Sequence, residues 1–286
     1  MRALVLSGGG AKGAYQVGAL RRIMKESNRE YEILCGVSVG ALNVAALGMT
    51  RIGDPKGAFD RLESFWMTLD NPKVWKKRAW GNILSAFFEV SIYDATPLAN
   101  VVRANLDPAV LAQSGKRIRV GSVALDSGEY RVAKQDDPNF VDWVLASSSF
   151  PVFFQPIRID GKTWSDGGIR NVTPLGEAIR LGATEIDVIM CSNPDVPNLW
   201  DPTGKRAVET AIRAIDIMGD EIVRTDLEVA GLKNDLARLD ASYREVAIRV
   251  IKPMKILAAN PLDFSPASIR AMMATGYEDA TWSERP

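Results

Sequence analysis

Two strand-turn-helix units within the first 50 residues constrain the fold more than any other feature of the sequence. Residues 3–6 form a short apolar run that ends in glycines, and residues 14–24 follow with helical spacing. The apolar run at residues 33–35 enters a second glycine-bounded turn, and an alanine- and leucine-rich helix is expected at 41–49. Consecutive units of this kind predict an α/β fold in which helices cross over a parallel sheet.

Later segments extend the predicted sheet. Strands are expected at residues 117–125, 130–133, 186–190 and 246–251, with a hairpin at 157–164 that turns at Asp160-Gly161. Helices are expected at 141–147 and over 207–239, as one long helix or two, and residues 151–156 are expected to be extended. No repeat or linker interrupts the chain, so residues 1–286 are expected to form a single domain.

Composition excludes several classes of protein. The net charge of +0 provides no overall basic field, so nucleic acid is not an expected partner. Cys35 and Cys191 lie in apolar runs and are expected to be buried thiols, which fits a cytoplasmic location. No apolar stretch predicts a signal peptide or a membrane-spanning helix.

The histidine count of zero limits the available chemistry. A histidine-dependent triad and a histidine-ligated metal site are both excluded. No loop has the ligand spacing of a calcium site, so neither a metal nor a cofactor is expected.

A nucleophile elbow is predicted at Gly36-Val37-Ser38-Val39-Gly40, which matches G-x-S-x-G between an apolar strand and a helix. The flanking glycines allow the backbone to fold tightly beneath the serine. The alternative is an ordinary glycine-bounded turn, because a pattern with three fixed positions also occurs by chance.

The first glycine loop allows two interpretations. Gly8 to Gly13 satisfies G-x-G-x-x-G after a strand, but a dinucleotide site needs an acidic residue at the end of the second strand, which here ends at Cys35-Gly36. Outward-pointing N–H groups of Gly9, Gly10 and Ala11 instead suit an oxyanion hole. Lys12 either supports a phosphate or oxyanion, or is a solvated residue of the first helical turn.

Without histidine, a serine nucleophile needs a carboxylate, a lysine or a terminal amine as its base. Asp166, followed by Gly167 and Gly168, stands at the end of the predicted hairpin, where backbone can approach closely. Taken alone, the D-G-G pattern is more often a plain turn.

Four blocks, taken in order, resemble the patatin-like phospholipase family. They are the glycine-rich Ser7 to Gly13, the nucleophile block Gly36 to Asn43, the small-residue and proline segment Ala146 to Pro156, and Asp166-Gly167-Gly168 continued by Asn171 and Pro174. The tail from Asp263 to Tyr277 is similar to the end of many bacterial members, whereas residues 51–116 and 194–247 match weakly.

The resemblance implies a three-layer α/β/α sandwich with a mainly parallel central sheet. It implies a catalytic pair of Ser38 with Asp166, an oxyanion hole at Gly8 to Gly10, and the motif glycines Gly13, Gly36, Gly40, Gly167 and Gly168. The expected activity is hydrolysis of lipid acyl esters through an acyl-enzyme, of the phospholipase A or lysophospholipase type. The alternatives are an acyltransferase or thioesterase that uses the same pair, and a non-catalytic lipid-binding protein.

Residues 66–88 are a candidate for peripheral contact with a membrane surface. The segment interleaves aromatic with basic side chains, namely Trp66, Trp75, Trp80, Phe87 and Phe88 with Lys73, Lys76, Lys77 and Arg78. Such residues favour the depth of lipid headgroups. The alternative is that the aromatic side chains cover the core.

Overall fold

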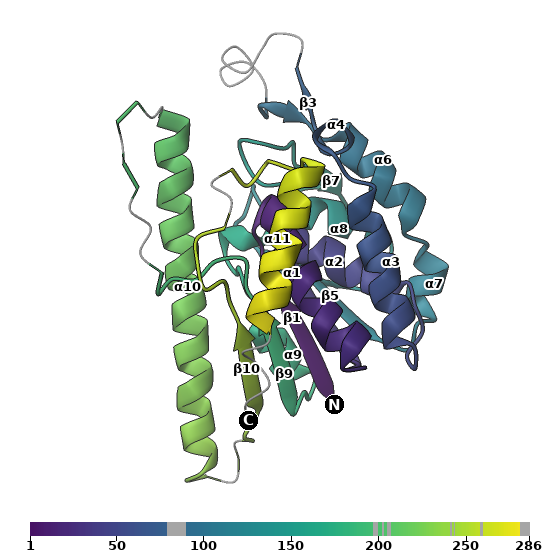
Figure 1. Ribbon diagram of the computed structural model, residues 1–286, viewed down its shortest axis with the longest axis vertical. Coiled ribbons are helices and arrows are strands. Elements are labelled where there is room, and N and C mark those ends of the chain that lie inside the picture. Colours follow the sequence, from purple (N-terminus) through teal and green to yellow (C-terminus); the bar gives the residue numbers. More distant parts are fainter. Residues whose placement is uncertain are drawn as a thin grey trace.

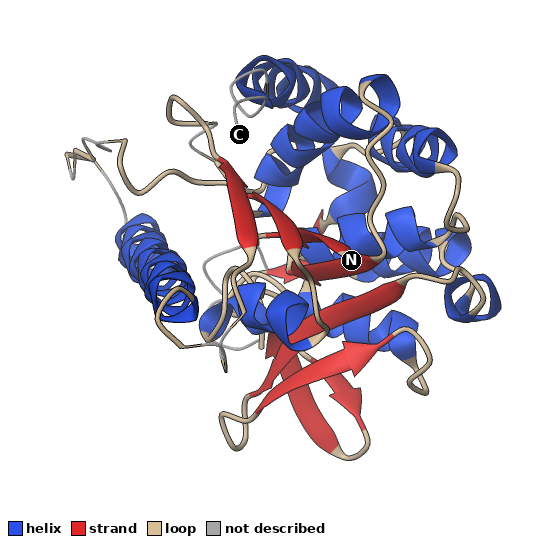
Figure 2. Cartoon of the chain, turned by 90° about the horizontal axis from the view of Figure 1, so that it is seen from below, coloured by secondary structure: helices blue, strands red, loops and turns tan. Residues whose placement is uncertain are grey.

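The computed structural model describes residues 1–78, 90–196, 200–201, 203–204, 207–240, 242, 244–257 and 260–280. Within these residues, eight strands form one sheet whose central path is β10-β9-β1-β2-β5-β8-β7, and β6 pairs with β5. Helices cover both faces of the sheet (Figures 1 and 2), which confirms the predicted three-layer α/β/α arrangement. The single domain expected for residues 1–286 stays a prediction.

The strands of the large sheet are β1 (Arg2–Leu6), β2 (Ile33–Val37), β5 (Arg117–Ala124), β6 (Tyr130–Lys134), β7 (Ile157–Ile159), β8 (Lys162–Asp166), β9 (Glu185–Ile189) and β10 (Ala247–Ile251). A separate pair is formed by β3 (Lys76–Lys77) and β4 (Tyr93–Asp94). The helices are α1 (Gly13–Leu20), α2 (Val39–Gly48), α3 (Pro55–Met67), α4 (Asn71–Val74), α6 (Thr96–Asn105), α7 (Pro108–Ala112), α8 (Phe140–Ser147), α9 (Leu175–Arg180), α10 (Ala207–Ala237) and α11 (Pro266–Asp279). Short turns of 3-10 or π type occupy η1 (Gly10–Lys12), η2 (Arg21–Glu26) and η3 (Gly167–Ile169).

The sheet is mainly parallel, as predicted. β1 pairs in parallel with both β2 and β9, β9 with β10, and β2 with β5. Antiparallel strands extend the sheet beyond β2, since β6 and β8 each pair with β5 and β7 pairs with β8. The hairpin between β7 and β8 turns at Asp160 and Gly161, whose φ angles of 51° and 79° match the left-handed backbone of a tight two-residue turn.

Alternating residues of the central strands supply two apolar cores. Leu4 and Leu6 of β1 face the core shared with α1, α2, α3, α8 and α11, whereas Ala3 and Val5 face the core beneath α9 and α10. The predicted segment 207–239 forms one long helix, α10. It contributes Val223 and Ala230, seven residues apart, to the second core.

Helix α11 lies along α1 (Figure 1), and glycines set how closely the two backbones approach. A Cβ atom on Gly18 would lie 1.9 Å from the carbonyl oxygen of Met273. A Cβ atom on Gly276 would lie 2.0 Å from the carbonyl oxygen of Tyr15. Each helix therefore presents a glycine to the backbone of the other, and the C-terminal helix is an integral part of the first core.

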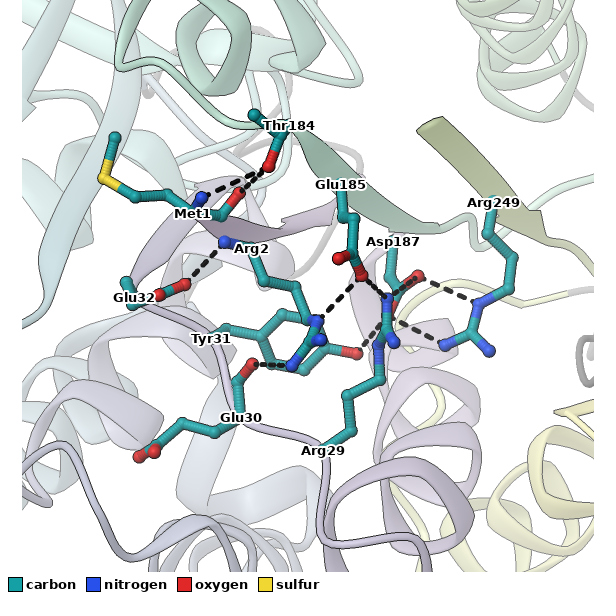
Figure 3. Close-up of polar contacts among 10 residues, drawn as sticks. All are labelled: Met1, Arg2, Arg29, Glu30, Tyr31, Glu32, Thr184, Glu185, Asp187 and Arg249. Carbon is teal, nitrogen blue, oxygen red and sulfur yellow. Dashed lines mark hydrogen bonds and ion pairs between the residues drawn. The ribbon is translucent and has the colours of Figure 1, made fainter. Parts of the chain in front are cut away.

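A buried carboxylate joins β9 to its neighbours (Figure 3). Asp187 is 1% exposed and accepts hydrogen bonds from Arg29 Nε at 2.6 Å, the Tyr31 hydroxyl at 2.5 Å and Arg249 Nε at 2.9 Å. Burial and the Asp187 charge raise the pKa of Tyr31 well above its ordinary value, so its hydroxyl stays a donor. The network anchors the edge strand β10 to the loop that precedes β2.

Residues 151–156 were expected to be extended, but this is wrong, because Phe154 N–H donates to Phe150 O at 2.9 Å and Val152 has φ 71°.

In the segment 66–88 the core interpretation holds for Trp66, which is 1% exposed. Trp80, Phe87 and Phe88 lie outside the described residues. Both cysteines are buried free thiols, as expected.

Candidate active site

The two predicted catalytic residues stand at the ends of strands that approach each other along one edge of β5. Val37, the last residue of β2, pairs with Gly121, and Asp166, the last residue of β8, pairs with the adjacent Ser122. β2 runs parallel to β5 and β8 antiparallel, and β6 occupies the opposite edge over the same residues. The carboxyl ends of β2 and β8 therefore meet, which brings Ser38 and Asp166 together across 128 positions of sequence, the difference between their numbers.

Ser38 has the strained backbone that the predicted nucleophile elbow requires. Its φ of 56° and ψ of −129° lie outside the regions that ordinary side chains prefer, and such strain costs about 1–3 kcal/mol. The flanking glycines are required by close backbone packing. A Cβ atom on Gly36 would lie 2.3 Å from Gly40 O, and one on Gly40 would lie 2.3 Å from Leu6 O. Ser38 is also the residue before α2, whose N-terminus favours negative charge.

A run of serines at the end of α8 holds both partners in place. Ser147 Oγ accepts a hydrogen bond from Ser38 N–H at 3.0 Å, and Ser148 Oγ donates to Ser38 O at 3.2 Å. The carbonyl oxygen of Ser149 accepts from Asp166 N–H at 3.1 Å. The sequence marked this segment as part of a family block, but it gave no indication that consecutive serines fix the elbow and the aspartate.

Asp166 is buried, with 1% of its surface exposed. Burial raises its pKa from 3.8 to about 7, and interaction with the Ser38 hydroxyl and a hydrogen bond from Gly168 N–H at 2.7 Å only partly oppose the shift. Its second carboxylate oxygen, Oδ2, is buried without a partner at ordinary hydrogen-bond distance in the described part of the chain. A carboxyl group with this pKa can accept a proton near neutral pH.

The glycine loop uses two of its N–H groups to hold its own shape. Gly8 N–H donates to Val172 O at 3.1 Å, and Ala11 N–H donates to Pro261 O at 2.7 Å. Both groups were among the expected oxyanion donors. Because each already has a backbone acceptor, neither is available in this conformation without breaking that bond.

The N–H groups of Gly9 and Gly10 have no hydrogen-bond acceptor among the described residues. Their φ angles are 156° and 59°, which favour glycine. The loop lies against Ser38, since a Cβ atom on Gly8 would be 3.1 Å from Ser38 Cβ. Gly9 and Gly10 are thus the two loop donors free to bind an anion beside Ser38.

Buried polar side chains connect the loop to the helix that follows Ser38. Gln16 Nε2 donates to Ser7 O at 2.9 Å, and Asn43 Nδ2 donates to Gln16 Oε1 at 2.8 Å. Asn43 Oδ1 accepts from Trp66 Nε1 at 2.7 Å. Each group has its partner, so the network adds rigidity at an acceptable cost of burial. Sequence reasoning missed Gln16; a glutamine within the otherwise apolar residues 14–20 was the available signal.

Ser38 and Asp166 line a cleft with a volume of about 220 Å³. Apolar side chains make up one part of the lining: Val74, Leu98, Phe150, Phe153, Phe154, Leu257, Leu262 and Phe264. Charged side chains make up another: Lys12, Arg213, Asp216, Asp220 and Lys255. Lys12 therefore faces the cleft, as a role at an anion requires. Burial raises the pKa of the Asp216 carboxyl and the Lys12 charge partly opposes the shift, so the two side chains lie within electrostatic range.

No cluster of three or more histidine, cysteine, aspartate or glutamate side chains able to hold a metal occurs in the described part of the chain. Among the same residues, none of the helices combines the length and the apolar character that crossing a membrane requires.

Three comparisons relate the chain to known proteins. The model of the patatin-like phospholipase family matches residues 4–179, more than half of the chain. The uncharacterized protein YjjU of Escherichia coli (strain K12) is 28% identical over 189 residues, which cover 65% of this chain and 51% of YjjU. The structure of VipD from Legionella pneumophila is similar over 98% of this chain and 66% of VipD, with 14% identity and a TM-score of 0.45. The protein belongs to the patatin-like phospholipase family.

Proposed function

We propose that the protein is a lipid acyl-ester hydrolase in which Ser38 is the nucleophile and Asp166 is its base. The observation that carries the proposal is the meeting of a strained serine with a buried carboxyl group whose pKa is about 7. Strain and a perturbed pKa both cluster at catalytic sites. Membership of a phospholipase family supports the same assignment.

In this mechanism Asp166 accepts the Ser38 proton as Oγ attacks the ester carbonyl. Negative charge develops on the former carbonyl oxygen, and the N–H groups of Gly9 and Gly10 stabilise it, with a further contribution from the N-terminus of α2. The leaving alcohol takes the proton from Asp166. Water then attacks the acyl-enzyme while Asp166 again acts as the base, so both displacements use one set of groups.

The cleft supports a lipid as the substrate. Its large apolar lining suits an acyl chain, and the charged part near Lys12 and Arg213 suits a polar headgroup. An acyltransferase or a thioesterase would use the same acyl-enzyme and differ only in acceptor or donor. The paired Ser38 and Asp166 favour catalysis over lipid binding alone.

Contact with a lipid surface is part of the proposal. Lys73, Lys76 and Lys77 are exposed beside the small β3–β4 sheet, which supports the basic half of the predicted contact segment. Apolar side chains at the rim of the cleft offer a second contact, since Ile215 of α10 and Ile256 line the cleft and remain 37% and 51% exposed.

The test is hydrolysis by wild type, Ser38→Ala and Asp166→Asn. A chromogenic butyrate ester should be assayed beside a phospholipid, a lysophospholipid, an acylglycerol and an acyl thioester, with and without an added alcohol as acyl acceptor. Both variants should lose turnover by a factor of at least about 1000, because the two groups act as a unit. Ser127→Ala, at an exposed turn, is the matched serine control.

Near-wild-type turnover in either variant, with folding confirmed by circular dichroism, would remove the pair from the mechanism. Lipid binding without turnover of any ester by wild type would support the binding alternative instead.

A further inference from the structure

A second, smaller cavity of about 20 Å³ lies beside the cleft. Its lining is Leu42, Ala46, Arg61, Phe65, Val102, Asn105 and Leu106. Among the described residues, Leu42 is the one side chain that lines both this cavity and the cleft of Ser38. Leu42 is half-buried and packs on the edge of the first core.

Two helices lead from one cavity to the other. On α2, Leu42 lies one turn after Ser38, and Ala46 lies one turn further along the same helix face. The rise of the helix places them about 6 and 12 Å beyond Ser38 along the helix axis. On α6, Leu98 lines the cleft and Val102, one turn later, lines the second cavity. The seam between α2 and α6 therefore continues the apolar side of the cleft beyond Leu42.

The second cavity has an apolar part and a polar outer part. Phe65, Val102 and Leu106 are buried. Arg61 and Asn105 are exposed, and Arg61 Nη2 donates to Asn105 O at 3.3 Å, which joins α3 to α6. A methylene chain gains from the apolar part and nothing from the polar part, so the cavity has room for only a short further length of chain.

We propose that the seam between α2 and α6 receives the distal part of the substrate's acyl chain, and that Leu42 sets the chain length the site accepts. The proposal rests on the proposed acyl-ester hydrolysis at Ser38. A chain bonded to Ser38 Oγ and directed along α2 meets Leu42 first. With leucine there, a chain that ends in the cleft fits, and a longer chain must displace the side chain.

Replacing Leu42 by alanine joins the two cavities, and replacing Ala46 by leucine fills the second one. Each further buried methylene is worth about fourfold in kcat/KM at 25 °C. Leu42→Ala should therefore raise the ratio of kcat/KM for a hexadecanoate ester to that for an octanoate ester by about tenfold. Ala46→Leu should leave that ratio at the wild-type value or below it, and should cancel the gain when combined with Leu42→Ala.

The assay uses p-nitrophenyl butyrate, octanoate, dodecanoate and hexadecanoate below their aggregation limits. Val44→Ala is the matched control, because Val44 lies on α2 in the same core and lines neither cavity. The control should keep the wild-type ratio, which separates the chain-length effect from loosening of the helix. An unchanged ratio in Leu42→Ala overturns the proposal.

Binding of the carboxylate product tests the chain site without turnover. Calorimetric titration of octanoate and hexadecanoate into Ser38→Ala, with and without Leu42→Ala, should show a preference for the longer chain only when Leu42 is absent. If wild type hydrolyses no ester and this preference still appears, the proposed catalysis fails and the chain site stands. If esters are hydrolysed but Leu42→Ala changes neither the kcat/KM ratio nor the binding preference, the chain-site proposal is wrong and the proposed catalysis stands.

Discussion

The carbonyl oxygen of Pro261 is in contact with the backbone of Gly10. It accepts the Ala11 N–H at 2.7 Å, and a Cβ atom on Gly10 would lie 2.4 Å from it. Pro261 lies outside residues 4–179, over which the family model matches. The position of the glycine loop therefore depends on the segment that leads to α11, and this contact leaves no room for a side chain at Gly10.

Gly10→Ala should lower kcat by roughly 100- to 1000-fold, the range seen when one oxyanion donor is lost. The added Cβ must push the loop away from Pro261, so the Gly10 N–H no longer points at the developing charge. Gly128→Ala is the control: it has a similar φ of 71° but open space around it. Equal losses in the two variants would attribute the effect to backbone strain alone.

The pH dependence of kcat/KM should follow the ionisation of Asp166. Because burial raises its pKa to about 7, the carboxyl group is protonated at lower pH and cannot act as the base. The rate on a neutral ester should rise as pH increases and level off above about 7. A flat profile down to about pH 5 would contradict Asp166 as the base.

The same shift predicts a pH-dependent effect on stability. Between pH 3.8 and about 7 the folded chain holds a proton that the unfolded chain has lost, so stability falls as pH rises and the full cost is present above about 7. Asp166→Asn removes this cost, and its stability relative to wild type should be greater at pH 8 than at pH 4 by roughly 1–4 kcal/mol in urea denaturation. Hydrogen bonds from Thr96 lower the pKa of Asp94, so Asp94→Asn should show the opposite sign, with a change confined mostly to pH below 3.8 and little difference between pH 4 and pH 8.

The local features of the fold could be predicted from the sequence, whereas the contacts that assemble the site could not. The elbow at Ser38 and the turn at Asp160 depend on neighbouring glycines, which the sequence displays. Pairing of Gly121 and Ser122 with the two strand ends is a long-range register, and no local pattern encodes it. The bond from Ser147 to Ser38 is hidden for the same reason.

One local signal was missed. Ser265 caps α11 by accepting the Ser268 N–H at 3.3 Å, and Pro266 occupies the first turn. This pairing of a serine cap with a first-turn proline is readable in the sequence. The backbone of Val152, by contrast, could not be predicted from local sequence. Its side chain favours extended backbone, whereas tertiary contacts hold φ at 71°.

Asp187→Leu should destabilise the fold by about 3 kcal/mol, because it leaves Arg29, Arg249 and the buried Tyr31 hydroxyl without their acceptor (Figure 3). Denaturant unfolding measures the loss. Asp195→Ala is the control for an exposed ion pair, here with Lys252, and should cost less than about 1 kcal/mol. A loss of that small size in Asp187→Leu would show that the network is not needed to hold β10.

Charge reversal tests the contact with a lipid surface. Lys73, Lys76 and Lys77 changed to glutamate should weaken co-sedimentation with anionic vesicles, because each cation near such a surface contributes about 1 kcal/mol. Arg78 is left unchanged, because it donates to Ser91 Oγ at 3.0 Å and supports local structure. Reversal at exposed Lys134 should have little effect. Equal sedimentation of the triple variant and wild type would exclude this segment as the contact.

Part of the cleft wall comes from segments of the chain other than those that supply the proposed catalytic groups. Ser38, Asp166 and the glycine loop belong to the sheet and its tight turns, where an added carbon atom meets backbone. Ile215 of α10 and Ile256, which line the same cleft, are partly exposed and are not packed in either core. The protein thus combines a tightly packed candidate site with a partly exposed wall, and mutational libraries confined to α10 and residues 254–257 should alter which ester enters while the proposed catalytic groups stay fixed.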